Sequence, residues 1–156
     1  MNSFMQVDDL DRRLLRLTQS DPTASVPALA KDARMSVAVA RRKLDRLEAA
    51  GVLKGRQAVI DWAALGYAVE VSLRITIDKA QPQGFDQFLA AARDIPEVIE
   101  IQTFLGRVDL RLSVLARDMA HYQELYRDRI LTLPHIADIE ALMHVASVKS
   151  DEGLPI

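Results

Sequence analysis

The stretch Ser36-Val37-Ala38-Val39-Ala40-Arg41-Arg42-Lys43-Leu44-Asp45-Arg46-Leu47-Glu48-Ala49-Ala50-Gly51 predicts one helix whose two ends are both marked in the sequence. Ser36 suits the N-cap, because its hydroxyl can accept a hydrogen bond from an unpaired amide of the first turn. Gly51 suits the left-handed residue that commonly follows a last helical turn. Ala40, Leu44 and Leu47 recur at helical spacing, so we expect them to be buried together.

On the opposite side of this helix, the side chains are small near its start and basic further along. At about 100° per residue the outward positions are Ala38, Val39, Arg42, Asp45, Arg46 and Ala49, with Arg41 on the flank. Small side chains let a helix N-terminus approach a DNA groove, and arginines behind them can reach phosphates or guanine edges. An ordinary amphipathic helix with a solvated basic face has the same pattern, so this helix alone does not decide between the two.

Two shorter helices are predicted before it. The first spans Val7–Leu17 with Asp8 or Asp9 as its cap, and the second follows Ser25 with Pro27 in its first turn. Their inward residues are expected to be Leu10, Leu14 and Leu17 in the first, and Leu29 and Ala33 in the second. Because Arg34-Met35 then forms a tight turn into Ser36, the segment predicts a helix-turn-helix whose second helix reads DNA.

The segment Val52–Ile60 is rich in branched residues and predicts a strand, either as a wing or as a linker. Asp61–Gly66 resembles a turn, and a domain boundary is expected there. We predict a DNA-binding domain over residues 1–52, an extended linker strand over 53–67, a second domain over 68–150 and a tail over 151–156.

The second half of the chain changes period. Val69–Ile77 alternates apolar and polar residues, which is typical of a half-buried strand. The elements expected after it are a helix over Phe85–Ala92, a strand over Val98–Leu105, a turn over Gly106–Asp109, a strand over Leu110–Val114, a helix from Asp118 to Ile130 and a strand over Ile136–Val148. This β-α-β-β-α-β order predicts a ferredoxin-like domain with both helices on one face of an antiparallel sheet.

Charge and composition support two modules of different character. Residues 1–60 hold eleven Lys/Arg and seven Asp/Glu, whereas residues 61–156 hold nine and fifteen, so the first module is positive and the second negative. A basic module is expected to meet a polyanion. The chain has no cysteine, which excludes disulfides, and it has neither an apolar run of membrane-spanning length nor a signal peptide at Met1–Phe4. We therefore expect a cytoplasmic protein without a membrane partner.

With these modules placed, the chain resembles the Lrp/AsnC (feast/famine) family of bacterial and archaeal transcription regulators from about Val7 to Lys149. The order and spacing of many residues carry the resemblance: Val7-Asp8, Leu10-Asp11, Leu14-Leu15, Leu29-Ala30-Lys31, Ser36, Arg42, Arg46-Leu47-Glu48, Gly51-Val52-Leu53, Gly55, Gly106, Asp109, Asp118-Met119, Tyr122 and Leu133-Pro134.

The resemblance implies an α+β fold, an N-terminal winged helix-turn-helix followed by the ferredoxin-like βαββαβ domain. It also implies dimers that assemble into octamers, with an amino acid or related metabolite bound in clefts between dimers. Five positions depart from the family pattern. Arg34 replaces a turn glycine, Asp45 replaces a basic residue on the reading helix, Arg107 replaces an acidic or small residue, and Ile139 and Ala141 stand where a hydroxyl residue is frequent.

We accordingly predict a transcription regulator, not an enzyme, whose partners are double-stranded DNA, a small-molecule effector and further copies of itself. The predicted DNA-binding residues are Ser36, Ala38, Val39, Arg41, Arg42 and Arg46, and the predicted effector-binding residues are Gly106, Arg107, Val108 and Asp109. No cofactor is expected. The three histidines lack the spacing of metal ligands, so no metal site is expected either. A metabolite-binding assembly protein with weakened DNA binding remains the alternative.

Overall fold

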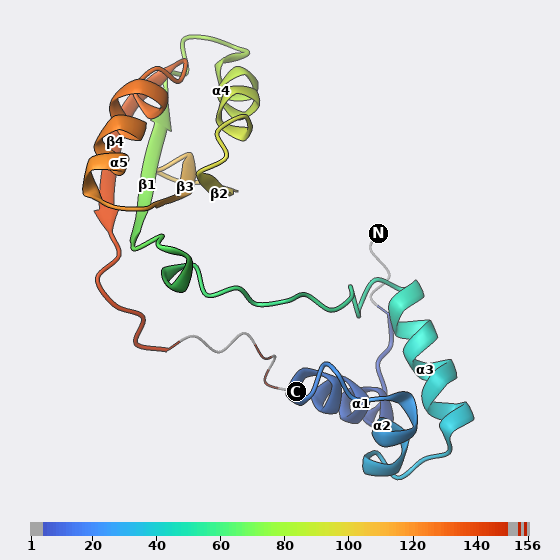
Figure 1. Cartoon of the computed structure of the whole chain (residues 1–156). Helices are drawn as coiled ribbons and strands as arrows, with labels where there is room; N and C mark the ends of the chain where they lie inside the picture. The colour runs from blue at the N-terminus through green and yellow to red at the C-terminus, as the bar shows by residue number, and fades with distance from the viewer. Residues whose placement is uncertain (1–4, 150–152, 154, 156) are drawn as a thin grey trace. The chain divides into compact units, whose positions relative to one another are not determined.

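The structure is a computed structural model that describes residues 5–149, 153 and 155. The chain divides between Val59 and Ile60 into two compact units with separate hydrophobic cores, inside the segment predicted to connect two domains. Figure 1 shows the helical unit in blue and cyan and the sheet unit in green to orange. Most of the predicted tail over 151–156 lies outside the described residues.

The helical unit consists of α1 (Asp9–Ser20), α2 (Val26–Asp32) and α3 (Val37–Ala49). The predicted caps are confirmed, because the side chains of Asp8, Ser25 and Ser36 accept hydrogen bonds from amides of the first turns of α1, α2 and α3. The buried residues of this unit that cluster together are Leu14, Leu29, Ala30, Ala33, Ala40 and Leu44.

The inward face of α1 differs from the prediction. Leu10 is 39% exposed, and the buried residues are Asp11, Leu14 and Thr18. Thr18 satisfies its hydroxyl inside the helix by donating to the Leu14 carbonyl at 2.9 Å. The prediction of Leu10 as an inward residue is therefore wrong, because a carboxylate occupies the position that was expected to be apolar.

Two left-handed residues shape the ends of the helices. Arg34 has φ 58° in the turn between α2 and α3, and the amide of the next residue, Met35, donates to the Ala30 carbonyl at 2.9 Å. A side chain at such a φ is strained, as the departure from the family glycine suggested. Gly51 has φ 69° after α3, which confirms the expected left-handed residue.

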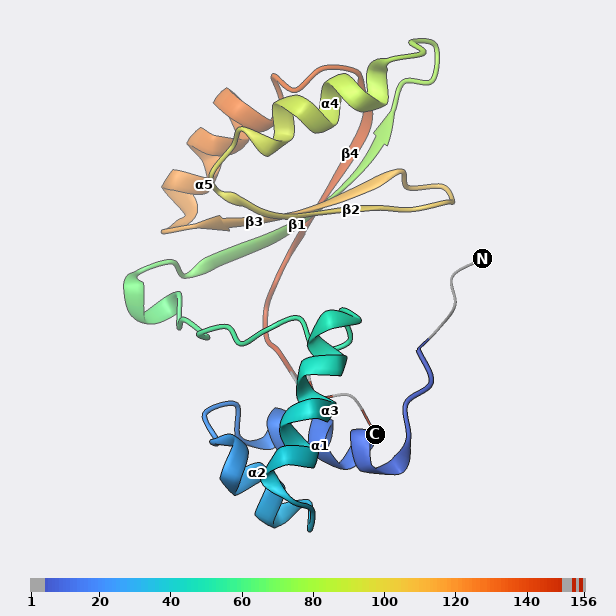
Figure 2. The ribbon, with the colours of Figure 1, turned by 90° about the vertical axis from the view of Figure 1, so that its right-hand side faces the viewer.

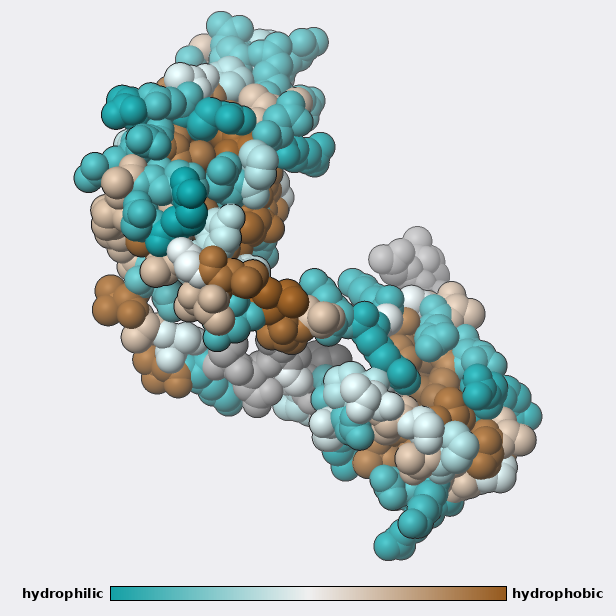
Figure 3. Space-filling model, viewed as in Figure 1, coloured by the Kyte–Doolittle hydropathy of each residue, from teal (hydrophilic) through white to brown (hydrophobic). Residues whose placement is uncertain are grey.

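The strand predicted over Val52–Ile60 is not formed. The amides of Val52 and Leu53 donate to the Leu47 carbonyl, but residues 54–60 make no backbone hydrogen bond with the part of the chain that the structure describes. Val59 is 94% exposed, and apolar side chains lie open along this connection (Figure 3). Branched residues favour extended backbone, but none of the described residues forms a strand beside this segment to complete a ladder.

The sheet unit contains β1 (Val69–Ile77), α4 (Gly84–Arg93), β2 (Val98–Thr103), β3 (Leu110–Ala116), α5 (Met119–Leu125) and β4 (Ile136–Met143). A 3-10 turn over Ala63–Leu65 precedes it, and a π-helical turn over Tyr126–Ile130 extends α5. The strands are antiparallel in the order β2-β3-β1-β4, which confirms the ferredoxin-like prediction. Figure 2 shows both helices over one face of the sheet.

The two faces of this sheet differ as the alternation predicted. Val71, Leu73 and Ile75 are fully buried toward the helices with Phe88 of α4. The opposite face is polar and paired: Arg74 lies 3.5 Å from Glu140, and the Ser113 hydroxyl donates to Glu100 at 3.3 Å. β4 ends at Met143 and not at the predicted Val148. No helix among the described residues is long and apolar enough to cross a membrane.

Candidate nucleic-acid interface and effector turn

The exposed side of α3 forms a shallow depression. It is lined by Val37, Ala38, Arg41, Arg42 and Asp45. Three of these were predicted as DNA-binding residues, and Val37 was not, although it lies one turn before Arg41. The guanidinium groups of Arg41 and Arg42 form no ion pair with any described residue.

The other predicted DNA-binding residues lie at the margins of this depression. The Ser36 hydroxyl caps α3 by accepting from the Val39 amide at 3.3 Å. The Val39 side chain is half-buried. Arg46 lies outside the depression and forms an ion pair with Asp11 of α1. The structure thus brings together Ala38, Arg41 and Arg42 and places the remaining three at the edges.

Asp11 is the centre of a cluster that ties α1 to α3. Its side chain is fully buried, and its oxygens accept from the Arg46 guanidinium and from Lys43 Nζ at 3.0 Å. Lys43 Nζ also lies 2.6 Å from Asp8 Oδ2. The caps are reciprocal: the Asp11 amide donates to Asp8 Oδ1 at 2.7 Å, and the Asp8 amide donates to Asp11 Oδ2 at 2.9 Å. Two carboxylates and two cations therefore form a compensated group.

The cluster stabilises its charged forms. The side-chain hydrogen bond from Lys43, followed by the bond from the Asp11 amide, lowers the pKa of Asp8 to about 2. Burial opposes ionisation of Asp11, but the hydrogen bonds from the Asp8 amide, Lys43 and Arg46 together outweigh it and lower the pKa of Asp11. The hydrogen bond to Asp8 likewise raises the pKa of Lys43. This arrangement keeps both carboxylates ionised at neutral pH.

The predicted effector turn connects β2 to β3 and is fixed by bonds to β1. The Thr76 hydroxyl donates to the Arg107 carbonyl at 3.2 Å, and the Asp109 amide donates to the Ile75 carbonyl at 3.0 Å. Gly106 and Arg107 are exposed, whereas Val108 and Asp109 are half-buried. The structure therefore brings these four residues together at the turn between β2 and β3, with Arg107 exposed.

The Asp109 carboxylate already has two partners. It accepts from the Ile77 amide at 3.0 Å, and Lys79 Nζ lies 3.4 Å away. Sequence reasoning missed Lys79 because it lies 30 residues before Asp109, and no local pattern links a residue after one strand to a turn between two others. An ammonium group of the chain itself thus lies beside the Asp109 carboxylate.

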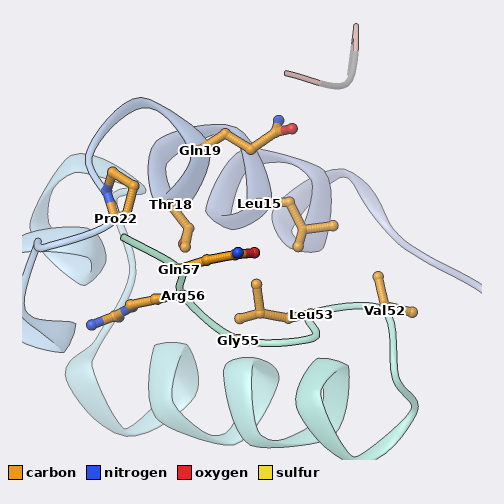
Figure 4. A pocket seen from close by; sticks show the side chains of 9 residues that line it. All are labelled: Leu15, Thr18, Gln19, Pro22, Val52, Leu53, Gly55, Arg56 and Gln57. Atoms are coloured by element: carbon orange, nitrogen blue, oxygen red, sulfur yellow. The ribbon is translucent and has the colours of Figure 1, made fainter. Parts of the chain in front are cut away.

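A separate cavity lies within the helical unit. It has a volume of about 260 Å³ between α1 and the residues that follow α3, with Leu15, Thr18 and Leu53 on its apolar side and Arg56 and Gln57 beside them (Figure 4). It shares no lining residue with the depression on α3. Among the residues that the structure describes, no group of three His, Asp or Glu side chains is placed to hold a metal ion.

Comparison with protein families identifies both domains of the chain. A model of the winged helix-turn-helix DNA-binding domain matches residues 7–54, and a model of the Lrp/AsnC ligand binding domain matches residues 70–154, more than half of the chain. The chain belongs to the Lrp/AsnC family. Lrp/AsnC is a family of transcription regulators.

Named relatives span nearly the whole Lrp/AsnC chain. It is 28% identical to the DNA-binding transcriptional activator DecR of Escherichia coli K12, over 96% of this chain and 99% of that protein. It is 28% identical to the glutamate uptake regulatory protein of Zymomonas mobilis, over 97% and 92%. It is 29% identical to the leucine-responsive regulatory protein of Salmonella typhimurium, over 96% and 92%.

Solved structures of Lrp/AsnC proteins share the fold. An AsnC family transcriptional regulator from Agrobacterium tumefaciens has a TM-score of 0.85 and 30% identity, covering 96% of this chain and 97% of that one. A transcriptional regulator of Neisseria meningitidis in complex with L-Met has a TM-score of 0.88 at 23% identity, with coverage of 96% and 97%. This Lrp/AsnC chain is thus a DNA-binding transcription regulator with an N-terminal helix-turn-helix and a C-terminal ligand-binding domain.

Proposed function

We propose that this regulator binds double-stranded DNA by placing the N-terminal half of α3 in the major groove, with Arg41 and Arg42 as its main contacts. The observation that carries the proposal is the exposed depression on α3, where two arginines without an ion-pair partner among the described residues follow the small Ala38. Ala38 permits close approach, and a guanidinium can bind phosphate or a guanine edge with two parallel hydrogen bonds.

The predicted residues at the margins of the depression contribute less to DNA binding in this proposal. The Ser36 hydroxyl accepts a hydrogen bond from the Val39 amide, so its own O–H is still able to donate to a phosphate oxygen. Val39 contributes apolar contact from the edge. Asp45 lies in the same depression and can accept from a cytosine amine, but it also opposes phosphate. Specificity would then depend on the balance between Arg42 and Asp45.

The test is a titration of a labelled duplex from the DNA immediately upstream of this protein's coding sequence, at several salt concentrations. Arg42→Ala should weaken binding by about 1–3 kcal/mol if the arginine reads a base. It should reduce the salt slope by about 0.9 if the arginine binds a phosphate. Arg129→Ala, which removes the same charge from an exposed residue of the sheet unit, is the matched control.

If Arg41→Ala and Arg42→Ala both leave the affinity and its salt slope at the parent values, the assigned surface is wrong. If no duplex binds the parent protein while small carboxylates still stabilise it, the chain acts as a metabolite-binding assembly protein.

We further propose that the turn Gly106–Asp109 binds the carboxylate of an effector, an amino acid or a related metabolite. Support comes from the exposed Arg107 side chain beside a turn whose backbone is fixed by Thr76 and Ile75. Because Lys79 pairs with Asp109, the charge of Arg107 is the one at this turn that no carboxylate of the described residues balances. This charge favours an effector with an extra carboxylate, which Arg107 can hold bidentately.

A thermal-shift screen of amino acids and dicarboxylates tests this second proposal. A ligand present at 100 times its Kd should add about 2.7 kcal/mol to the stability of the folded state. Arg107→Ala should weaken the stabilisation by dicarboxylates more than that by monocarboxylates. If every ligand stabilises Arg107→Ala as much as it stabilises the parent protein, Arg107 does not bind the effector.

Self-association completes the proposal. We propose dimers, since two reading helices must lie one helical turn of DNA apart, about 34–36 Å, to bind a two-fold related site. We further propose that these dimers assemble into octamers, as the resemblance to the family implies. The exposed Val59, Ile60 and Leu65 of the connection support burial against a second copy. Light scattering at several concentrations measures this assembly directly. We also propose that this regulator acts in the cytoplasm.

A further inference from the structure

Asp11 is a buried charge in a unit that binds a polyanion. A carboxylate of this kind costs free energy to bury unless it is paired, and by its charge alone it opposes DNA binding. Its two cationic partners, Lys43 and Arg46, both come from α3, 32 and 35 residues later in the chain. The pairing therefore links the buried side of α1 to the helix that we propose reads DNA.

Arg46 differs from Lys43 in what it can still do. The Lys43 side chain is 12% exposed, and its ammonium group already pairs with the carboxylates of Asp8 and Asp11. The Arg46 side chain is 48% exposed and contacts Asp11 through one terminal nitrogen, Nη2. A guanidinium has five N–H donors in a planar fork, so most of them remain available on the solvent side.

The position of Arg46 on α3 indicates what these donors can meet. Arg46 lies one turn after Arg42, in the half of α3 that follows the depression. In helix-turn-helix proteins the N-terminal residues of the reading helix contact base edges, and contacts around them go mostly to phosphates. Arg46 at this position on α3 is therefore suited to bind a phosphate beside the groove.

We propose that Asp11 is a positioning residue for DNA binding, whose carboxylate holds the Arg46 guanidinium so that its free edge binds a DNA phosphate. The inference rests on the proposed use of α3 as the reading helix. Asp11 then raises DNA affinity although it carries the wrong charge, because it removes the rotamer freedom that a long side chain loses on binding.

The direction in which Asp11→Asn changes DNA affinity distinguishes positioning of Arg46 from the effect of charge alone. Asp11→Asn removes one negative charge, so electrostatics alone predicts tighter binding of the upstream duplex. Positioning predicts binding that is weaker by about two- to tenfold, the loss expected when one such side chain is no longer preorganised. The matched control is Asp9→Asn, which makes the same charge change on an exposed residue of α1 and should bind as tightly as the parent or tighter.

A double-mutant cycle shows whether Asp11 acts through Arg46. Arg46→Ala should lower the salt slope by about 0.9, the value for one lost phosphate contact. Adding Asp11→Asn to Arg46→Ala should cause no further loss of affinity. Arg46→Lys keeps the charge but not the fork, so it should restore the salt slope and only part of the affinity.

Folding of each variant is checked by circular dichroism, since Asp11 also holds Lys43 and the Asp8 amide. If Asp11→Asn does not fold, Asp11→Glu keeps the charge and displaces the carboxylate by one methylene, and it should also weaken binding. The inference is overturned if the folded variant binds like Asp9→Asn, or if the losses from Asp11→Asn and Arg46→Ala add. Failure of Arg41→Ala and Arg42→Ala to weaken binding would instead overturn the proposed reading surface.

Discussion

Leu14→Ala should destabilise the helical unit and leave the stability of the sheet unit unchanged. Leu14 is fully buried among Leu29, Ala30, Ala33, Ala40 and Leu44, and this cluster contains no residue of the sheet unit. Truncation of a fully buried leucine costs about 3–5 kcal/mol through lost burial and the cavity left behind. A unit of about 60 residues has roughly 3–9 kcal/mol of stability in total. The substitution therefore removes a third or more of what holds the helices together.

Hydrogen exchange read by mass spectrometry resolves the two units, because peptides from α1 and α3 report on one and peptides from β1 and β3 on the other. In Leu14→Ala we expect the protection of α1 and α3 to fall by about two to four powers of ten, since each 1.4 kcal/mol is a factor of ten. Protection of β1 and β3 should stay at the parent level. DNA binding should weaken in parallel with the folded fraction of the helices.

Two further variants make the result decisive. Leu73→Ala, at a fully buried residue of β1, should give the reverse pattern. Leu10→Ala changes a residue that the sequence placed inward but that is 39% exposed, and it should cost less than about 1 kcal/mol. Equal loss of protection in α1 and β1 for Leu14→Ala would refute the separation of the cores. A cost at Leu10 equal to that at Leu14 would refute the assigned orientation of α1.

Two other substitutions test local features of the helical unit. Arg34→Gly should stabilise the unit by about 0.5–1 kcal/mol, measured from the urea midpoint, because glycine relieves the positive φ at a smaller entropic cost, whereas Arg34→Ala should give no gain. Because the pKa of Asp8 is lowered from 3.8 to about 2, its contribution to stability is complete above pH 3.8 and is lost as the pH falls toward 2. Urea midpoints measured across this range should fall less steeply in Asp8→Asn; slopes equal to those of the parent would contradict the pairing with Lys43.

Periodicity predicted the sheet unit well because the partners of each strand are within the chain. The alternation in Val69–Ile77 identified the buried Val71, Leu73 and Ile75, and pairing with β3 and β4 then follows from the order of the elements. The same reasoning failed for Val52–Ile60. Branched residues there indicate extended backbone, but a strand exists only where another strand accepts its hydrogen bonds.

Features of the site that depend on residues close together in the sequence could be predicted, and those that depend on contacts between distant residues could not. Ser36, Gly51 and the buried stripe of α3 follow from spacing within one helix, and so does the exposure of Arg42. The buried carboxylate of Asp11 does not follow from any local rule, since its partners lie 32 and 35 residues away. For the same reason the sequence assigned Arg46 outward without showing that one of its nitrogens is bound.

The connection without backbone hydrogen bonds limits the reach of the reading unit. Residues 54–60 span at most about 25 Å when fully extended, at about 3.3–3.6 Å per residue. One turn of B-DNA is about 34–36 Å. A tether of this contour length lets a reading helix follow modest changes in the distance between half-sites, and the tether of one subunit is by itself shorter than a full turn of the duplex. Operator spacing is thus constrained by chain length as well as by base contacts, and shortening or lengthening this segment is a way to retune which sites a pair of subunits can occupy together.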